Sequence, residues 1–316
     1  MVGLLSYLIF FLTVVLILGI ATMGLNLQWG FTGLFNAGVV GFFAIGGYTV
    51  AILSAQPQAG LIGNFGLPWV VGLLGAVVVS ALAALIIGFA TVRLRGDYLA
   101  VATFGTAMSI QIVALNWGAL TGGSQGMVSV TRPLQHLTGD AIPYHVFFLL
   151  LMLAFTAVVY IGLERIVRSP WGRVLRALRE DETAAIALGK NAVSYRLQAF
   201  VVGAVLIGLS GALYVSYVGF VSPADFVPMV TFQLWAMLIV GGSGNNRGAL
   251  LGSFVVWAIW TGSGALMVKL VPPNYQTQGA ALQSILIGLL LVVTLLYRPR
   301  GILGEQAVVS RHAGDD

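Results

Sequence analysis

Residues 67–92 read LPWVVGLLGAVVVSALAALIIGFATV and contain no charged side chain. A helix needs about 20 apolar residues to cross the roughly 30 Å hydrocarbon core of a bilayer. This run is long enough, so it predicts a helix that spans a membrane. Eight further runs share its composition: 4–23, 37–55, 98–115, 144–163, 197–220, 226–240, 249–268 and 279–297. The run 226–240 is short.

The stretch 24–36, between the first two runs, is too polar and too rich in glycine for an ordinary span. We expect it to form a broken or re-entrant segment. The sequence therefore predicts an all-α fold, a polytopic transmembrane helical bundle of about eight to ten spans with broken or short helices. The longest polar stretches, of about thirty residues, are too short to form an independent core. We accordingly treat residues 1–316 as a single transmembrane domain.

Composition supports a membrane protein. The chain is 59% hydrophobic and 8% charged, with a mean hydropathy of +0.97, whereas soluble domains carry about 25% charged residues. The absence of cysteine excludes disulfides, thiolate metal sites and cysteine nucleophiles, and we expect no metal site. The net charge of +5 does not indicate nucleic-acid binding, because the charges lie between the apolar runs.

Basic residues gather in segments that lie on one side of the membrane if the spans alternate. The segment 164–196 contains seven, the turn 93–97 two, and the tail 298–316 three. The positive-inside rule places these segments in the cytoplasm. We therefore expect a cytoplasmic loop at 164–196 and a cytoplasmic tail at 298–316. The side of the N-terminus depends on whether residues 24–36 cross, and we leave it open.

The loop 164–196 contains the signals of an amphipathic helix. Ser169 is suited to an N-cap and Pro170 to the first helical position. An apolar stripe follows at helical spacing, formed by Val174, Leu175, Leu178, Ala185, Ile186 and Leu188. Gly189 is a natural C-terminal stop. We expect one short helix on the cytoplasmic face, or two with a break near Asp181. Such a helix needs a groove on a partner or the lipid interface.

Residues 183–189, TAAIALG, resemble the EAA loop of ABC-importer permeases, whose core is Glu-Ala-Ala followed four residues later by Gly. Thr183 stands where that pattern has Glu, and Glu182 lies one position earlier. The longer string 169–189 is similar to the corresponding loop of LivM-type branched-chain amino-acid permeases. The resemblance covers nearly the whole chain, with further landmarks in order: LRGDY at 94–98, NW at 116–117, LTGG at 120–123, GFVSP at 219–223, GGSG at 241–244 and RPRG at 298–301.

That resemblance implies a permease subunit of a binding-protein-dependent ABC importer in an inner membrane of bacterial type. The substrates would be branched-chain or other apolar amino acids, with urea or another small polar solute as the alternative. The implied partners are a second homologous permease, two ABC ATPases, a periplasmic or extracellular solute-binding protein and membrane lipid. ATP and Mg²⁺ would bind the ATPases, leaving no cofactor and no enzymatic activity on this chain. The implied ATPase-coupling residues are Trp171, Arg173, Arg176, Thr183, Ala184, Ala185 and Gly189.

Two glycine-rich segments lie beside polar interruptions, one near Asn26 and Asn36 and the other at 241–252. Gly244 and Gly248 begin a small-xxx-small spacing that lets helices approach closely. Because paired Gly-interrupted segments often mark a transport site, we consider an internal repeat. The expected pathway and packing residues are Asn26, Asn36, Thr103, Thr106, Gly244 and Gly248. In the alternative reading, the polar side chains among them bond to one another or to the backbone.

Two rival functions remain open. Residues 208–211, GLSG, match the nucleophile pattern of intramembrane serine proteases, which needs a base within hydrogen-bond reach. No histidine follows Ser210 inside a predicted span, because His136 lies in an outer loop, His145 at an outer helix end and His312 in the tail. Packing is the simpler role for Ser210. A stand-alone secondary carrier is the second rival, and the EAA-like helix distinguishes it from a permease because a carrier needs no ATPase dock. The chain has no GxxxxGK[ST] loop, so it is not the ATPase itself.

Overall fold

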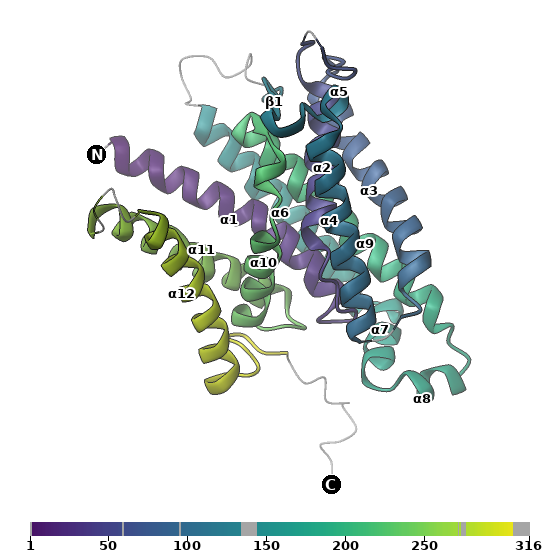
Figure 1. The fold of residues 1–316 in the computed structure, drawn as a ribbon. Helices are drawn as coiled ribbons and strands as arrows, with labels where there is room; N and C mark the ends of the chain where they lie inside the picture. Colours follow the sequence, from purple (N-terminus) through teal and green to yellow (C-terminus); the bar gives the residue numbers. More distant parts are fainter. Residues whose placement is uncertain are drawn as a thin grey trace.

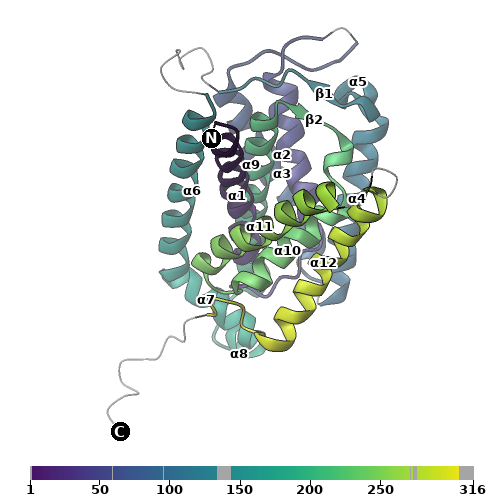
Figure 2. The ribbon, with the colours of Figure 1, turned by 90° about the vertical axis from the view of Figure 1, so that its left-hand side faces the viewer.

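The computed structural model describes residues 2–58, 60–94, 96–133, 144–270, 272 and 276–305. Within these residues, nine helices of 14 residues or more form a bundle, seen from two sides in Figures 1 and 2. These helices are α1 (Val2–Gln28), α2 (Val39–Ser54), α3 (Trp69–Thr91), α4 (Asp97–Asn116), α6 (Tyr144–Arg168), α9 (Ala192–Val218), α10 (Pro228–Gly241), α11 (Asn246–Leu270) and α12 (Gln276–Tyr297).

The nine apolar runs correspond one to one with these nine helices, which confirms the predicted helical bundle. Seven of the helices are long and apolar enough to cross a membrane, and α2 and the apolar part of α12 are shorter. A helix satisfies its backbone hydrogen bonds internally, so an apolar run has little alternative in lipid. The chain is thus a multi-pass membrane protein.

Short elements cap the two ends of the bundle. One end has α5 (Gly118–Thr121), η1 (Gly123–Gln125), η2 (Pro223–Asp225) and the antiparallel pair of β1 (Met127–Val128) with β2 (Phe220–Val221). The other end has α7 (Pro170–Glu180) and α8 (Glu182–Ala187). In Figure 1 the first group lies at the top and α7–α8 at the bottom.

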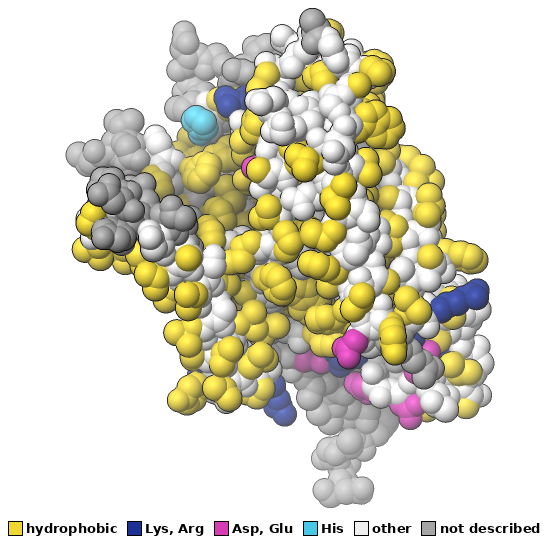
Figure 3. All heavy atoms as spheres, viewed as in Figure 1, with side chains coloured by type: hydrophobic (Ala, Val, Ile, Leu, Met, Phe, Trp, Pro, Cys, Tyr) yellow, Lys and Arg dark blue, Asp and Glu magenta, His cyan; other side chains and the backbone are white. Residues whose placement is uncertain are grey.

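The helix α1 lies at the centre of the bundle and is the most buried of the candidate spans. It packs against α6, α9, α10 and α11. The start of α1 lies at the end away from α7 and α8 (Figure 2). By contrast, only 17–28% of the residues in the spans α3, α4, α6 and α11 are buried. The flank of the bundle is largely hydrophobic, whereas acidic and basic side chains concentrate at the α7–α8 end (Figure 3).

The stretch 24–36 differs in part from the expectation of a broken segment. The helix α1 continues to Gln28, and only the following residues leave helical geometry before α2 begins at Val39. Gln28 and Asn36 are fully buried, and the Asn36 amide donates to Gln28 Oε1 at 2.9 Å. Gln28 also donates to the Phe200 carbonyl of α9 at 2.8 Å. These partners allow polar amides inside the bundle.

The segment after α12 returns to the bundle. Ile302 and Leu303 donate backbone hydrogen bonds to Val240 and Gly241 at the end of α10, each at 2.9 Å. The described part of the predicted tail 298–316 therefore lies at the same end as α7 and α8, and residues 306–316 lie outside the described residues.

Candidate functional site

The loop 164–196 folds into two helices with a break at Asp181, one of the two arrangements that the sequence predicted. α7 begins at Pro170, but the Ser169 hydroxyl donates back to the Ile166 carbonyl at 2.6 Å instead of capping α7. The Asp181 carboxylate caps α8 by accepting from the Ala184 amide at 3.0 Å. Gly189 ends α8 with a φ of 77°, a left-handed conformation that favours glycine.

The inward face of this helix pair packs on the bundle. Leu178 and Ala185 are buried, Ala185 with 4% of its surface exposed, and they form one small hydrophobic cluster with Ala192 at the start of α9. An ion pair between Arg196 of α9 and Glu182 of α8, at 3.0 Å with both side chains largely buried, fastens α8 to the bundle. The structure thus places Ala185 inside this interface and not on the surface.

The outward face of α8 is exposed and mostly apolar. Leu188 is 80% exposed and Ile186 50% exposed. We call the exposed residues Thr183, Ala184, Ile186, Ala187 and Leu188 the α8 outer face. It lies among the charged side chains at this end of the bundle (Figure 3). The predicted apolar stripe is therefore divided between an inner packing face and an outer free face.

The remaining predicted residues of the loop take different positions. The Trp171 indole donates to Gln198 Oε1 at 2.7 Å and ties α7 to α9. Arg173 and Arg176 line a polar cavity of about 460 Å³. Sequence reasoning missed Gly172, where a Cβ would overlap the Val167 carbonyl oxygen at the corner between α6 and α7. Only glycine fits that corner without movement of the backbone.

Sequence reasoning also missed Arg179, which joins three segments. Its Nη2 pairs with Glu305 Oε2 at 2.8 Å, and its Nη1 donates to the Gly30 carbonyl. Arg179 thereby connects α7 to the link between α1 and α2 and to the segment after α12. Its place within the seven basic residues of the loop gave no signal of this role, because the partners are more than a hundred residues away in sequence.

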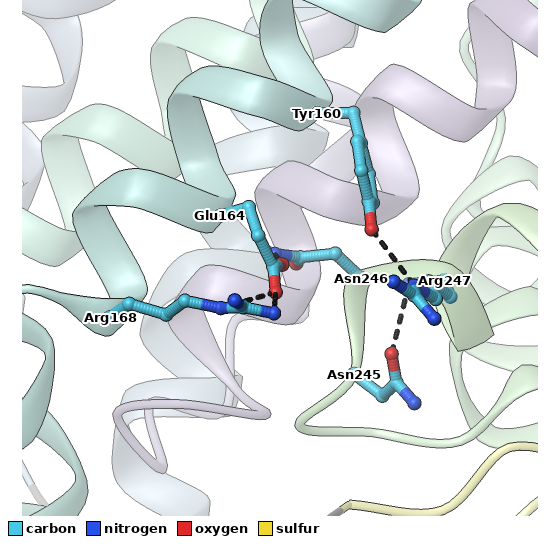
Figure 4. Close-up of polar contacts among 6 residues, drawn as sticks. All are labelled: Tyr160, Glu164, Arg168, Asn245, Asn246 and Arg247. Carbon is cyan, nitrogen blue, oxygen red and sulfur yellow. Dashed lines mark hydrogen bonds and ion pairs between the residues drawn. The ribbon is translucent and has the colours of Figure 1, made fainter.

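A buried amide network continues from that link. Asn26 of α1 donates to Asn246 Oδ1 at 3.0 Å and accepts from the Gly244 amide at 2.8 Å. Asn246 donates to Glu164 Oε2 at 3.1 Å, and Glu164 pairs with Arg168 at 2.6 Å. Figure 4 shows Asn246 and the α6 pair together. The two predicted glycine-rich segments thus meet through Asn26 and Gly244, while an internal repeat stays a prediction.

Of the other predicted pathway residues, Asn36 and Thr103 hold the α1–α2 link in place. Asn36 Oδ1 accepts from the Gly38 amide at 2.8 Å. Thr103 accepts from the Ala37 amide at 3.1 Å and donates to the Leu99 carbonyl. Thr106 donates to the Ala102 carbonyl within its own helix. Asn36 and Thr103 are buried, and a role for these residues in lining a pathway stays a prediction.

Gly244 and Gly248 lie where α10 and α11 meet. Gly244 precedes α11 with a φ of 79°. A Cβ at Gly248 would lie 2.7 Å from the Gly241 carbonyl oxygen. A Cβ at Gly252 would overlap the Met237 carbonyl oxygen. Ser210, the candidate nucleophile, is fully buried and donates to the Ile17 carbonyl at 2.6 Å, so it joins α9 to α1.

Comparison with known proteins bears on the whole chain. Residues 7–295 match the family described as the permease component of the branched-chain amino acid transport system. The high-affinity branched-chain amino acid permease LivM of Salmonella typhimurium is 30% identical over 312 residues, which cover 92% of this chain and 68% of the relative. The probable LivM of Methanocaldococcus jannaschii is 26% identical over 322 residues, covering 92% of this chain and 91% of the relative.

The permease LivH of Escherichia coli is 24% identical over 299 residues, which cover 90% of this chain and 91% of the relative. No solved structure matches the chain. The family match covers every element from α2 to α11, the α7–α8 pair included, and most of α1 and α12. The chain therefore belongs to the family of branched-chain amino acid transport system permeases.

Proposed function

We propose that this chain is one of two membrane-spanning permease subunits of an ATP-driven importer for branched-chain or other apolar amino acids. Family membership and the names of the LivM relatives support the class of substrate. The single observation that carries the mechanism is the α8 outer face, where Leu188 and Ile186 are exposed on a helix that is otherwise fastened to the bundle. In this proposal the face docks on an ATPase subunit, which binds ATP and Mg²⁺.

Motion of the ATPase would reach the bundle through rigid contacts. The Arg196–Glu182 pair and the Trp171–Gln198 hydrogen bond hold α8 and α7 to α9. Arg179 connects α7 to the α1–α2 link, from which Asn26 leads to the start of α11. If the packed interface has two stable arrangements, a small displacement of α7 and α8 can switch the bundle between them. The switch would change the side of the membrane to which the pathway is open. A second permease would complete the pathway.

The distribution of basic residues supports the orientation. The α7–α8 end contains most of the arginines, so it faces the cytoplasm, together with the end of the chain, by the positive-inside rule. The opposite end, with α5 and the β1–β2 pair, then faces the solute-binding protein. In such systems the solute-binding protein determines much of the substrate specificity. Urea or another small polar solute is therefore the alternative substrate.

The test replaces an exposed apolar side chain by a charge. Leu188→Glu should leave the permease folded but weaken its association with the ATPase by about tenfold or more, because docking would bury a leucine worth roughly 1.5–3 kcal/mol. The measurements are copurification of the ATPase and amino-acid uptake by proteoliposomes. Leu94→Glu is the matched control, since Leu94 is also exposed but lies in the α3–α4 turn.

Two results would contradict the proposal. The first is normal ATPase association and uptake in Leu188→Glu. The second is uptake by the chain reconstituted alone, which would make it a secondary carrier. The solute-binding protein that copurifies would decide the cargo by its affinity for leucine, isoleucine and valine against urea.

A further inference from the structure

An apolar groove runs between α6 and α11. Both helices pack along α1 but touch each other little, and a cavity of about 570 Å³ lies between them. We call it the α6–α11 groove; among its lining residues are Leu12, Leu16, Leu150, Leu153, Leu250 and Phe254. Leu150, Leu153 and Phe254 are exposed. The groove therefore opens on the hydrophobic flank of the bundle.

One end of the groove is basic. Arg247 lines it, and the Arg247 Nε donates to the Tyr160 hydroxyl at 3.1 Å, which orients the exposed guanidinium (Figure 4). Since a guanidinium has five N–H donors, others stay available for a ligand. The Asn245 side chain accepts from the Arg247 amide at 3.0 Å and fixes the first turn of α11. The start of this helix adds a partial positive charge at the same place.

Arg247 also belongs to the polar cavity of about 460 Å³ next to the groove. The other arginines that line this cavity are Arg168, Arg173 and Arg176. Two carboxylates line it as well, and each is already paired: Glu164 with Arg168 at 2.6 Å and Glu305 with Arg179 at 2.8 Å. The polar cavity thus has an excess of positive charge. It adjoins the α6–α11 groove at Arg247, which lines both.

The dimensions fit one leaflet of a bilayer. The α6 side of the groove extends from Tyr160 to Leu149, which corresponds to ~16 Å of helix at 1.5 Å per residue. Half of the hydrocarbon core measures roughly 15 Å. The basic end lies at the end of the bundle that we assign to the cytoplasm, where membranes carry anionic lipids.

We propose that the α6–α11 groove and Arg247 bind one anionic glycerophospholipid. An acyl chain lies in the groove, the phosphate contacts the Arg247 guanidinium, and the rest of the headgroup points toward Arg173 and Arg176. Arginine suits this role because its planar fork matches the geometry of phosphate oxygens. A helix of another protein could cover the groove, but its apolar surface would not complement the adjoining cationic cavity.

The test measures lipid retention by the full chain, together with the subunits that copurify, in native mass spectrometry. The probes are phosphatidylglycerol and phosphatidylethanolamine, each added to delipidated protein. We expect wild type to retain phosphatidylglycerol preferentially. Arg247→Ala should lower that retention about tenfold, because a hydrogen-bonded charged group is lost. Arg93→Ala, an exposed arginine in the α3–α4 turn, is the matched control and should retain the lipid as wild type does.

A second variant tests the apolar half. Leu153→Trp should fill the groove and lower phosphatidylglycerol retention, whereas Leu82→Trp, at an exposed position of α3, should not. Equal retention of both lipids by wild type, or unchanged retention in Arg247→Ala, would overturn the proposal. Competition by inorganic phosphate as strong as by the lipid would show a simple anion site. A helix of the second permease cross-linked in the groove, with no lipid retained, would also overturn it. Copurification of the ATPase, measured on the same variants, tests the proposed function independently of lipid retention.

Discussion

At the scale of single residues, removal of the Arg179 side chain should disturb contacts to two segments that lie more than a hundred residues away in sequence. In Arg179→Ala the buried Gly30 carbonyl loses its donor and Glu305 loses its ion pair. An unsatisfied buried polar group costs about 1–3 kcal/mol. We therefore expect the midpoint of thermal unfolding in detergent to fall by several degrees. The intrinsic fluorescence of the seven tryptophans provides the measurement.

The matched control is Arg173→Ala, an exposed arginine two turns earlier on α7, which should unfold at the wild-type temperature. Arg179→Lys should recover only part of the loss, because an ammonium is a compact charge without the fork that serves both partners. Equal midpoints for the alanine variants would remove Arg179 from the link between α7 and the bundle.

The same scale shows where sequence reasoning stops. Spacing placed Ala185 and Leu188 on one apolar stripe, yet one side chain is buried and the other is 80% exposed. The break at Asp181 and the stop at Gly189 follow from local chemistry and were predictable. Which flank of a short helix faces the bundle depends on Ala192 and Arg196 of α9, and helical periodicity contains no information about those contacts.

At the scale of elements, the close contact between α10 and α11 depends on glycines, which have no side chain to separate the two helices. Gly248→Ala and Gly252→Ala should each push the helices apart, because the added methyl meets the carbonyls of Gly241 and Met237. Overpacking of this kind costs about 1–3 kcal/mol. We expect less folded chain in size-exclusion chromatography and lower uptake in proteoliposomes.

Gly262→Ala provides the control on the same helix, since a Cβ there meets nothing within 4 Å. If all three variants behaved alike, close approach of the two helices would not explain the glycines at 248 and 252. The helices themselves were predictable from apolar runs, because lipid leaves a spanning backbone few alternatives. The extension of α1 to Gln28 was not predictable, because a buried amide inside a helix needs partners. The acceptors to which Asn26 and Gln28 donate are 220 and 172 residues away.

At the scale of the whole molecule, orientation can be tested directly because the chain has no native cysteine. Leu188→Cys and Ile62→Cys introduce single exposed thiols at opposite ends of the bundle. We expect a membrane-impermeant maleimide to label Ile62→Cys from outside intact spheroplasts. It should label Leu188→Cys only in inverted vesicles, prepared from cells without the ATPase because a docked ATPase would cover Leu188. The reverse pattern would contradict the orientation that the arginines predict.

The central position of α1 has a consequence for biosynthesis. Asn26 is made 220 residues before its partner Asn246, and at 5–20 residues per second the interval is roughly 10 to 45 s. Thr22 waits similarly for Ser253, to which it is hydrogen-bonded at 3.1 Å. During that time α1 is inserted without its final neighbours, and its amide must bond to water, lipid headgroups or the insertion machinery. The helix at the centre of the finished protein is thus made before the helices that surround it, and it is fully enclosed only once α11 has been made.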